Sequence, residues 1–176
     1  AALSTIVASK GSLPMSKKAK MLVRTDGEII GTVGGGCLEA DVWAEARDVM
    51  EAGESSLQKF VLTEKHAGDS GLNCGGNVEI FTEPLEKTDA EEMFKEIARI
   101  RKARESAVLA TRISSGEASA SKMLIREDGT TMGSLGDPEV ESIVRATLDE
   151  LGRISEDLLE VLDGGEDSGG EPQRVF

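Results

Sequence analysis

Apolar and polar positions along the chain predict strands, a hairpin and a helix in its first third. The β-branched stretch 3–9 predicts a strand. Two apolar runs at 20–24 and 28–33 flank an Asp-Gly pair, which is the usual pattern of a β-hairpin. Between 38 and 51 apolar residues recur at helical spacing and Gly53 follows the last of them, so we expect a helix that ends there.

Two further strands and a second helix are predicted next. The short stretch 57–62 and the alternating stretch 77–82, which closes at Pro84, are both typical of strands. Residues 88–91 (TDAE) have the spacing of a helix capping box. The helix that follows is expected to bury an apolar face made of Met93, Phe94, Ile97 and Ile100.

The chain then repeats its own sequence. Residues 20–27 (KMLVRTDG) recur as 122–129 (KMLIREDG), and residues 31–34 (GTVG) recur as 133–136 (GSLG). Both pairs are separated by 102 residues. In the second copy an amphipathic helix, the third predicted in the chain, is expected at 139–151, with an apolar face made of Val140, Ile143, Val144, Leu148 and Leu151.

Two copies of one unit predict an α/β fold. In this fold each of two pseudo-symmetric modules consists of a β-hairpin, a glycine loop and a helix, and the modules form mixed sheets with packed helices. We expect the two modules to have the same strand order and to be related by an approximate two-fold axis. We place the first module at 1–86 and a helix plus the second module at 87–176. Beyond the last predicted helix the match between the copies fades, and only an echo of 69–81 is expected at 167–176. The alternative is that a common supersecondary pattern recurs by chance.

The composition argues against nucleic acid as a partner. The 20 basic and 33 acidic residues give a net charge of −13, and there is one Trp, four Phe and no Tyr. Nucleic-acid binding usually needs the opposite charge and aromatic side chains that stack on bases. No apolar run approaches the ~20 residues of a membrane span, and no leader pattern opens this sequence, so we expect a cytoplasmic protein with no membrane partner. Because strand patterns reach almost to both ends, we also expect the natural chain to extend further.

The stretch 32–40 (TVGGGCLEA) is the strongest candidate for chemistry. Its glycines, Gly34, Gly35 and Gly36, let the backbone approach a ligand closely, and the helix that follows begins with unpaired N–H groups. This arrangement favours an anion, and the helix dipole at its first turn favours the thiolate of Cys37. The alternative is a tight turn in which Cys37 packs as a small apolar residue.

Basic residues and a second cysteine add to this picture. Residues 1–36 carry five basic side chains against two acidic ones, so an anion would be drawn there although the whole chain is acidic. The alternative is a solvated, lysine-rich loop. Cys74 also stands beside glycines, and because His66 is the single histidine, we do not expect a zinc site made of protein ligands alone.

Four motifs follow one another in the first half of the chain, 11–14 (GSLP), 19–23 (AKMLV), 31–40 (GTVGGGCLEA) and 74–81 (CGGNVEIF), the last of them before 83–85 (EPL). Through these motifs residues 2–85 show a specific resemblance to the XdhC/CoxI family, the xanthine dehydrogenase accessory proteins. It implies a chaperone, rather than an enzyme, that binds the molybdenum cofactor, protects it during sulfuration and passes it to a xanthine dehydrogenase-type molybdoenzyme. A cysteine desulfurase is a further implied partner.

Carried over residue by residue, the resemblance implies a cofactor-binding site with two edges. Its residues are Gly34, Gly35, Gly36, Cys37, Glu39, Cys74, Gly75 and Lys20. Lys17 and Lys18 are added on charge alone. The resemblance, together with the two glycine contexts, also leads us to expect Cys37 and Cys74 to face one shared pocket.

The second half departs from the family pattern. Many family members continue into a dinucleotide-binding-like domain, whereas here a degenerate copy of the first module follows. That copy has Gly136, Asp137 and Pro138 where the three glycines stand, and Glu139 in place of the cysteine. Carboxylates repel an anion and proline lacks an N–H donor, so we expect one cofactor per chain, bound by the first copy.

Two other functions stay open at this point. One is a sulfur carrier or thiol redox enzyme that uses Cys37 or Cys74, for which the sequence offers no dedicated base. The other is a docking module without catalytic activity. A homo-oligomer is compatible with all three functions.

Overall fold

The computed structural model describes residues 1–10, 19–34, 36–61, 76–85, 89–113, 120–151, 162–164 and 173–175. These residues form two compact units. Unit 1 comprises the described residues up to 85, and unit 2 comprises those from 89 onward.

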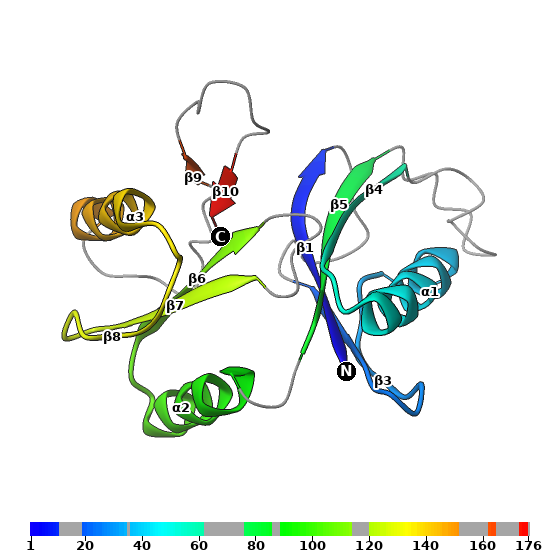
Figure 1. Cartoon of the computed structure of the whole chain (residues 1–176), viewed down its shortest axis with the longest axis horizontal. Coiled ribbons are helices and arrows are strands. Elements are labelled where there is room, and N and C mark those ends of the chain that lie inside the picture. The colour runs from blue at the N-terminus through cyan, green and yellow to red at the C-terminus, as the bar shows by residue number, and fades with distance from the viewer. Residues whose placement is uncertain are drawn as a thin grey trace. The chain divides into compact units, whose positions relative to one another are not determined.

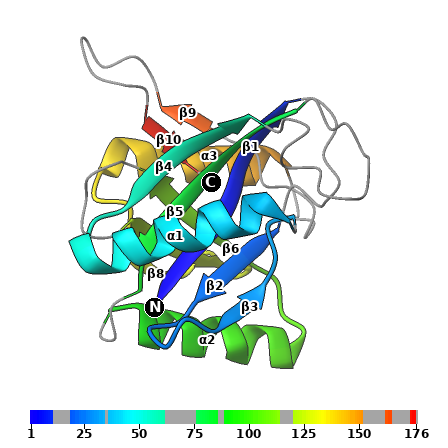
Figure 2. The same cartoon turned by 90° about the vertical axis from the view of Figure 1, so that its right-hand side faces the viewer.

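Unit 1 is a five-stranded antiparallel sheet with one helix packed on it. Its strands follow the order β3-β2-β1-β5-β4, and neighbours in this order are antiparallel (Figure 1). Their bounds are Ala2–Lys10 for β1, Lys20–Val23 for β2, Ile29–Gly31 for β3, Ser56–Val61 for β4 and Asn77–Pro84 for β5. Helix α1, Cys37–Ala52, crosses one face of this sheet, as Figure 2 shows.

The core of unit 1 lies between α1 and the sheet. The helix buries residues at the predicted spacing, Leu38, Val42, Ala46 and Val49. They pack against buried strand residues, Ala2, Ile6, Met21, Val23, Val78 and Ile80. The helix ends at Gly53, which is left-handed and donates its N–H to the carbonyl of Val49 at 2.9 Å. The helix predicted at 38–51, with its glycine stop, is confirmed.

Unit 2 has a second five-stranded antiparallel sheet and two helices. Its strand order is β8-β7-β6-β10-β9. The strand bounds are Ala107–Ile113 for β6, Ser121–Arg126 for β7, Thr131–Ser134 for β8, Leu162–Gly164 for β9 and Gln173–Val175 for β10. The helices are α2, Asp89–Ala103, and α3, Pro138–Leu151. The core under α3 contains Ala110, Met123, Ile125, Leu135, Val140 and Val144.

The two sheets have the same strand order. Strands β6, β7 and β8 correspond to β1, β2 and β3, and β10 lies beside β6 as β5 lies beside β1. The predicted α/β class is therefore confirmed, while the predicted two-fold axis stays a prediction. The prediction of mixed sheets is wrong, since all the strand pairs described are antiparallel. In unit 1 the reason is that α1 returns the chain to the far edge of the sheet, at β4, and not to a parallel neighbour of β3.

Two apolar residues of the predicted helix faces are exposed. Phe94 in α2 is 37% exposed and Ile143 in α3 is 41% exposed. Each stands one position, about 100° around the helix, from a buried residue, Met93 for the first and Val144 for the second. The buried face of each helix is therefore narrower than the sequence pattern predicts.

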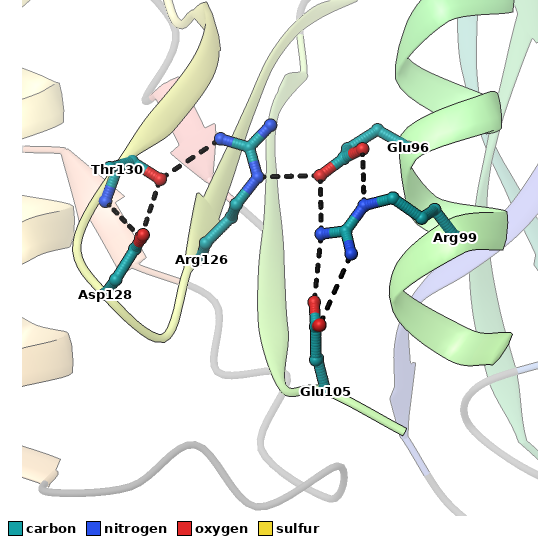
Figure 3. A network of polar contacts seen from close by, with 6 residues as sticks. All are labelled: Glu96, Arg99, Glu105, Arg126, Asp128 and Thr130. Carbon is teal, nitrogen blue, oxygen red and sulfur yellow. Dashed lines mark hydrogen bonds and ion pairs between the residues drawn. The ribbon is translucent and has the colours of Figure 1, made fainter. Parts of the chain in front are cut away.

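Helix α2 is tied to the sheet of unit 2 by a network of charged residues (Figure 3). Glu96 accepts hydrogen bonds from Arg126 of β7 at 2.8 Å and from Arg99 at 3.0 Å. Arg99 also donates to Glu105 at 2.9 Å. In the first copy of the repeat the matching residue, Arg24, pairs instead with acidic residues of its own hairpin turn. The network is therefore a feature of unit 2.

Candidate functional site

The chain leaves the edge of the unit 1 sheet at Gly31 and enters the glycine loop. Gly31 has a φ of +86°, and a Cβ there would lie 2.4 Å from the carbonyl oxygen of Lys20. This close approach lets the N–H of Thr32 donate to the same oxygen at 3.0 Å. Strand β3 ends here, earlier than the predicted end at 33, because the backbone turns at Gly31. Lys20 therefore supports the loop with its backbone, and its side chain is exposed.

A short chain of hydrogen bonds holds the loop against the first turn of α1. The hydroxyl of Thr32 donates to the carboxylate of Glu39. The N–H of Gly34 donates in turn to the Thr32 Oγ1 at 3.1 Å. Between them Val33 is fully buried and anchors the loop in the core. Loop and helix start are therefore fixed to each other by one hydroxyl and one carboxylate.

Helix α1 begins without a side-chain cap. Its N-cap residue is Gly36, with φ of +66° and ψ of −145°, and it makes no side-chain cap hydrogen bond. The first N–H groups of a helix have no partner within the helix and need one from outside. Cys37, the first helical residue, is exposed and is not part of a disulfide. The start of α1 thus presents backbone donors and a free thiol together.

The second copy holds its own loop in the same way. Ser134 Oγ donates to the carboxylate of Glu141 at 2.6 Å, and the N–H of Gly136 donates to Ser134 Oγ at 2.9 Å. The N–H of Leu135 donates a second hydrogen bond to Glu141 at 2.8 Å. The hydrogen bond from Ser134 first, and then that from Leu135, hold the pKa of Glu141 below its usual value.

The start of α3, unlike that of α1, is closed by a side chain. Asp137 Oδ1 accepts the backbone N–H of Glu139 at 2.9 Å and that of Val140 at 3.4 Å. Pro138, the first helical residue, has no N–H to satisfy. This is the usual geometry of an aspartate N-cap. The second copy therefore supplies its own anion at the helix start.

The structure brings together one edge of the predicted site. Gly34, Gly36, Cys37 and Glu39 lie on the loop and first turn described above, beside the backbone of Lys20. The other predicted residues lie outside the described residues, namely Gly35, Cys74, Gly75, Lys17 and Lys18. The shared pocket for the two cysteines accordingly stays a prediction. Within the described ranges no cluster of His, Cys, Asp and Glu is suited to hold a metal ion.

Two residues that shape this region, Thr32 and Asp137, are not among the predicted site residues. The repeat contains the signal for Thr32, because Thr32 and Glu39 have the same spacing as Ser134 and Glu141. Asp137 is expected only as a charge that repels an anion. The Asp-Pro pair at the start of a helical pattern is itself the signal of an N-cap.

Comparisons with known proteins agree with the motifs. A sequence model of the XdhC and CoxI family matches residues 1–61 and 100–165, so that both copies of the repeat are included. The uncharacterized protein YqeB of Escherichia coli (strain K12) is 38% identical over 80 residues, which are 46% of this chain and 15% of that protein.

None of the helices that the structure describes is long and apolar enough to cross a membrane.

A solved structure shares the fold. It is a crystal structure from Bacillus halodurans, described as that of a xanthine dehydrogenase, with a TM-score of 0.67 and 21% sequence identity. The similarity covers 82% of this chain and 43% of the other chain. This chain thus spans less than half of each of these two relatives. Because the family match covers most of the sequence and includes the glycine-cysteine loop, the chain belongs to the XdhC and CoxI family.

Proposed function

We propose that this chain binds the molybdenum cofactor at the start of α1 and acts as an accessory protein in the maturation of a xanthine dehydrogenase-type molybdoenzyme. Membership of the XdhC and CoxI family supports the association with such enzymes. The fold shared with the Bacillus halodurans protein described as a xanthine dehydrogenase is in line with it. The cofactor is cargo in this proposal, and it supplies its redox chemistry only in the client enzyme.

One observation carries the proposal: the start of α1 is open where the start of α3 is closed. In α3 the carboxylate of Asp137 binds the first-turn N–H groups. In α1 the N-cap is a glycine, and the exposed Cys37 follows it. A helix start favours negative charge, so the first copy is suited to take from a ligand the anion that the second copy provides internally.

The residues of this open start fit the chemistry of the cofactor. A pterin dithiolene with a phosphate is anionic and sensitive to oxygen. Gly34 and Gly36 leave the backbone accessible because they have no side chains. The first-turn N–H groups are donors for anionic oxygens, and the thiol of Cys37 is a ligand or sulfur contact for a soft centre. The chain's own residues therefore bind and shield, and no step of bond breaking is assigned to them.

The proposal is tested by titration of isolated molybdenum cofactor into the purified chain without oxygen, followed by absorbance. We expect one equivalent per chain. Cys37→Ser should weaken binding about tenfold, or by about 1.4 kcal/mol, without changing the fold. Glu139→Gln, the matched change in the second copy, should leave binding unchanged. Two equivalents per chain, or loss of binding in the Glu139 variant alone, would contradict the proposal.

A sulfur carrier is the second candidate function, and the exposed position of Cys37 favours it. In that case the thiol accepts a sulfur atom from a cysteine desulfurase that acts on free cysteine, which becomes alanine. The two functions are separated by mass spectrometry of the intact chain after incubation with a cysteine desulfurase and free cysteine. An added sulfur on Cys37 that is absent from Cys37→Ser would support the carrier, whereas cofactor binding without added sulfur supports the accessory protein.

A further inference from the structure

We propose that Glu39 is a positioning residue that acts through Thr32 and does not contact the ligand. Its carboxylate holds the Thr32 hydroxyl, and the hydroxyl holds the N–H of Gly34. The two residues thereby set the path of the glycine loop into α1. The effect on ligand affinity rests on the proposed function, but the effect on the loop does not.

The hydrogen-bond directions support this assignment. A carboxylate accepts hydrogen bonds, and the hydroxyl of Thr32 donates to Glu39 while it accepts from Gly34. Among the described residues of the loop, the hydroxyl of Thr32 is thus the group that links the carboxylate to the backbone. If it is removed, the N–H of Gly34 loses its acceptor and the loop is no longer tied to the helix. Glu39 is only partly buried, so its carboxylate is stabilised mainly by this hydrogen bond and by solvent.

The second copy separates loop positioning from ligand binding. It lacks the cysteine, and Asp137 occupies the helix start that a ligand would need. It nevertheless keeps the same arrangement, in which Ser134 links Glu141 to the N–H of Gly136. These hydrogen bonds are present in the second copy although its helix start is closed by Asp137, so their role is to hold the loop and not to bind a ligand. By the same reasoning Glu39 belongs to the frame of the site.

Electrostatics points the same way. A free carboxylate at the start of α1 would repel an anionic ligand, which is opposite to what the site needs. A carboxylate that accepts a hydrogen bond from the Thr32 hydroxyl has part of its negative charge compensated on the loop side. The arrangement therefore gives the loop a rigid support at small cost to anion binding.

The test uses the full chain with both cysteines kept, because Cys74 is itself a predicted site residue. Thr32→Val removes the hydroxyl at nearly constant shape, Glu39→Ala removes the carboxylate, and Thr32→Ser reproduces the arrangement of the second copy. Two quantities are measured: the hydrogen-exchange rate of the Gly34 amide by NMR, and the affinity for isolated molybdenum cofactor. Glu141→Ala is the matched control in the second copy.

We expect Thr32→Val and Glu39→Ala to raise exchange at Gly34 about fivefold to tenfold and to weaken the cofactor by a similar factor. Thr32→Ser should change neither quantity. Glu141→Ala should raise exchange at Gly136 and leave affinity unchanged. If the cofactor binds none of the proteins, the exchange rates still decide the positioning role, and only the proposed function fails.

Two results would overturn the inference. Weaker cofactor binding in Glu39→Ala, with exchange at Gly34 unchanged, would make Glu39 a direct ligand contact. Unchanged exchange in both Glu39→Ala and Thr32→Val would show that the hydrogen bonds do not hold the loop.

Discussion

Asp137 closes the start of α3 by accepting the backbone N–H of Glu139 at 2.9 Å. We predict that Asp137→Ala lowers the free energy of unfolding by about 1 kcal/mol, because the first-turn N–H groups lose their acceptor. Asp137→Asn should lose little, since asparagine is an equally good N-cap. Urea unfolding followed by circular dichroism measures both values. An equal loss in the two variants would show that the charge, and not the cap, stabilises α3.

The Asp-Pro pair at the start of α3 can be introduced at the start of α1 by mutation. Gly35→Asp combined with Gly36→Pro gives the first copy the Asp-Pro pair found at 137 and 138. We predict that this double variant loses cofactor affinity by at least about tenfold, because an internal carboxylate now competes for the helix start. Its free energy of unfolding should also fall, because Gly36 has a φ of +66° whereas proline is restricted to a φ of about −65°. Cofactor titration and urea unfolding are the measurements.

The reverse exchange is the control for this prediction. Asp137→Gly combined with Pro138→Gly opens the second copy but does not supply a thiol there. This variant should be less stable than the parent chain and should bind one cofactor as before. If the transferred Asp-Pro pair leaves affinity intact, the start of α1 is not the cofactor site.

Gly31 differs from Gly129, another turn glycine, in what surrounds it. Its φ is +86°, and a Cβ would lie 2.4 Å from the Lys20 carbonyl oxygen, whereas Gly129 has a φ of +79° and nothing near its Cβ position. Gly129→Ala should cost about 1–2 kcal/mol for the left-handed conformation alone. Gly31→Ala should cost clearly more, because the backbone of β2 must also move. Urea unfolding of the two variants gives the comparison, and equal losses would contradict it.

The fold was largely predictable from local patterns. The spacing of Leu38, Val42, Ala46 and Val49 gave α1 directly, because a buried helix face repeats every three to four residues. The Asp-Gly pairs predicted both hairpins, because this pair is typical of tight turns between antiparallel strands. The sheet type was not predictable in this way, since β1 and β5 pair across a long stretch of intervening chain. Local periodicity contains no information about the direction of such a partner.

Sequence patterns point to the residues of the candidate site but not to its hydrogen bonds. The three glycines and Cys37 stand out in the sequence because these residue types are rare together at a helix start. The bond from Thr32 to Glu39 depends on how the loop folds back over the first turn, so it became visible only in the structure. Only a comparison of the two copies, at the spacing shared by Ser134 and Glu141, indicates it beforehand.

Glu96 gives unit 2 a defined response to acid (Figure 3). Hydrogen bonds from Arg99 first, and then from Arg126, lower the pKa of Glu96 from 4.5 to about 2. Because the pKa of Glu96 is lower in the folded state, its ionised carboxylate stabilises the fold when the pH is above the pKa of the unfolded state. This contribution is lost as the pH falls from 4.5 through 2. We predict that the free energy of unfolding falls more steeply with acid in the parent chain than in Glu96→Gln.

Two measurements check this prediction. NMR titration of the Glu96 side-chain carbonyl should show a midpoint near 2 in the parent chain. In Arg126→Met this midpoint should rise towards the usual value, because the bond at 2.8 Å is lost. Urea unfolding between pH 5 and pH 2, roughly the interval over which such a carboxylate changes charge, should show the shallower slope in Glu96→Gln. Glu127→Gln, an exposed change in the β7–β8 turn, is the matched control and should keep the slope of the parent chain. A Glu96 midpoint that stays near 4.5 in the parent chain would mean that Arg99 and Arg126 do not hold this carboxylate in solution.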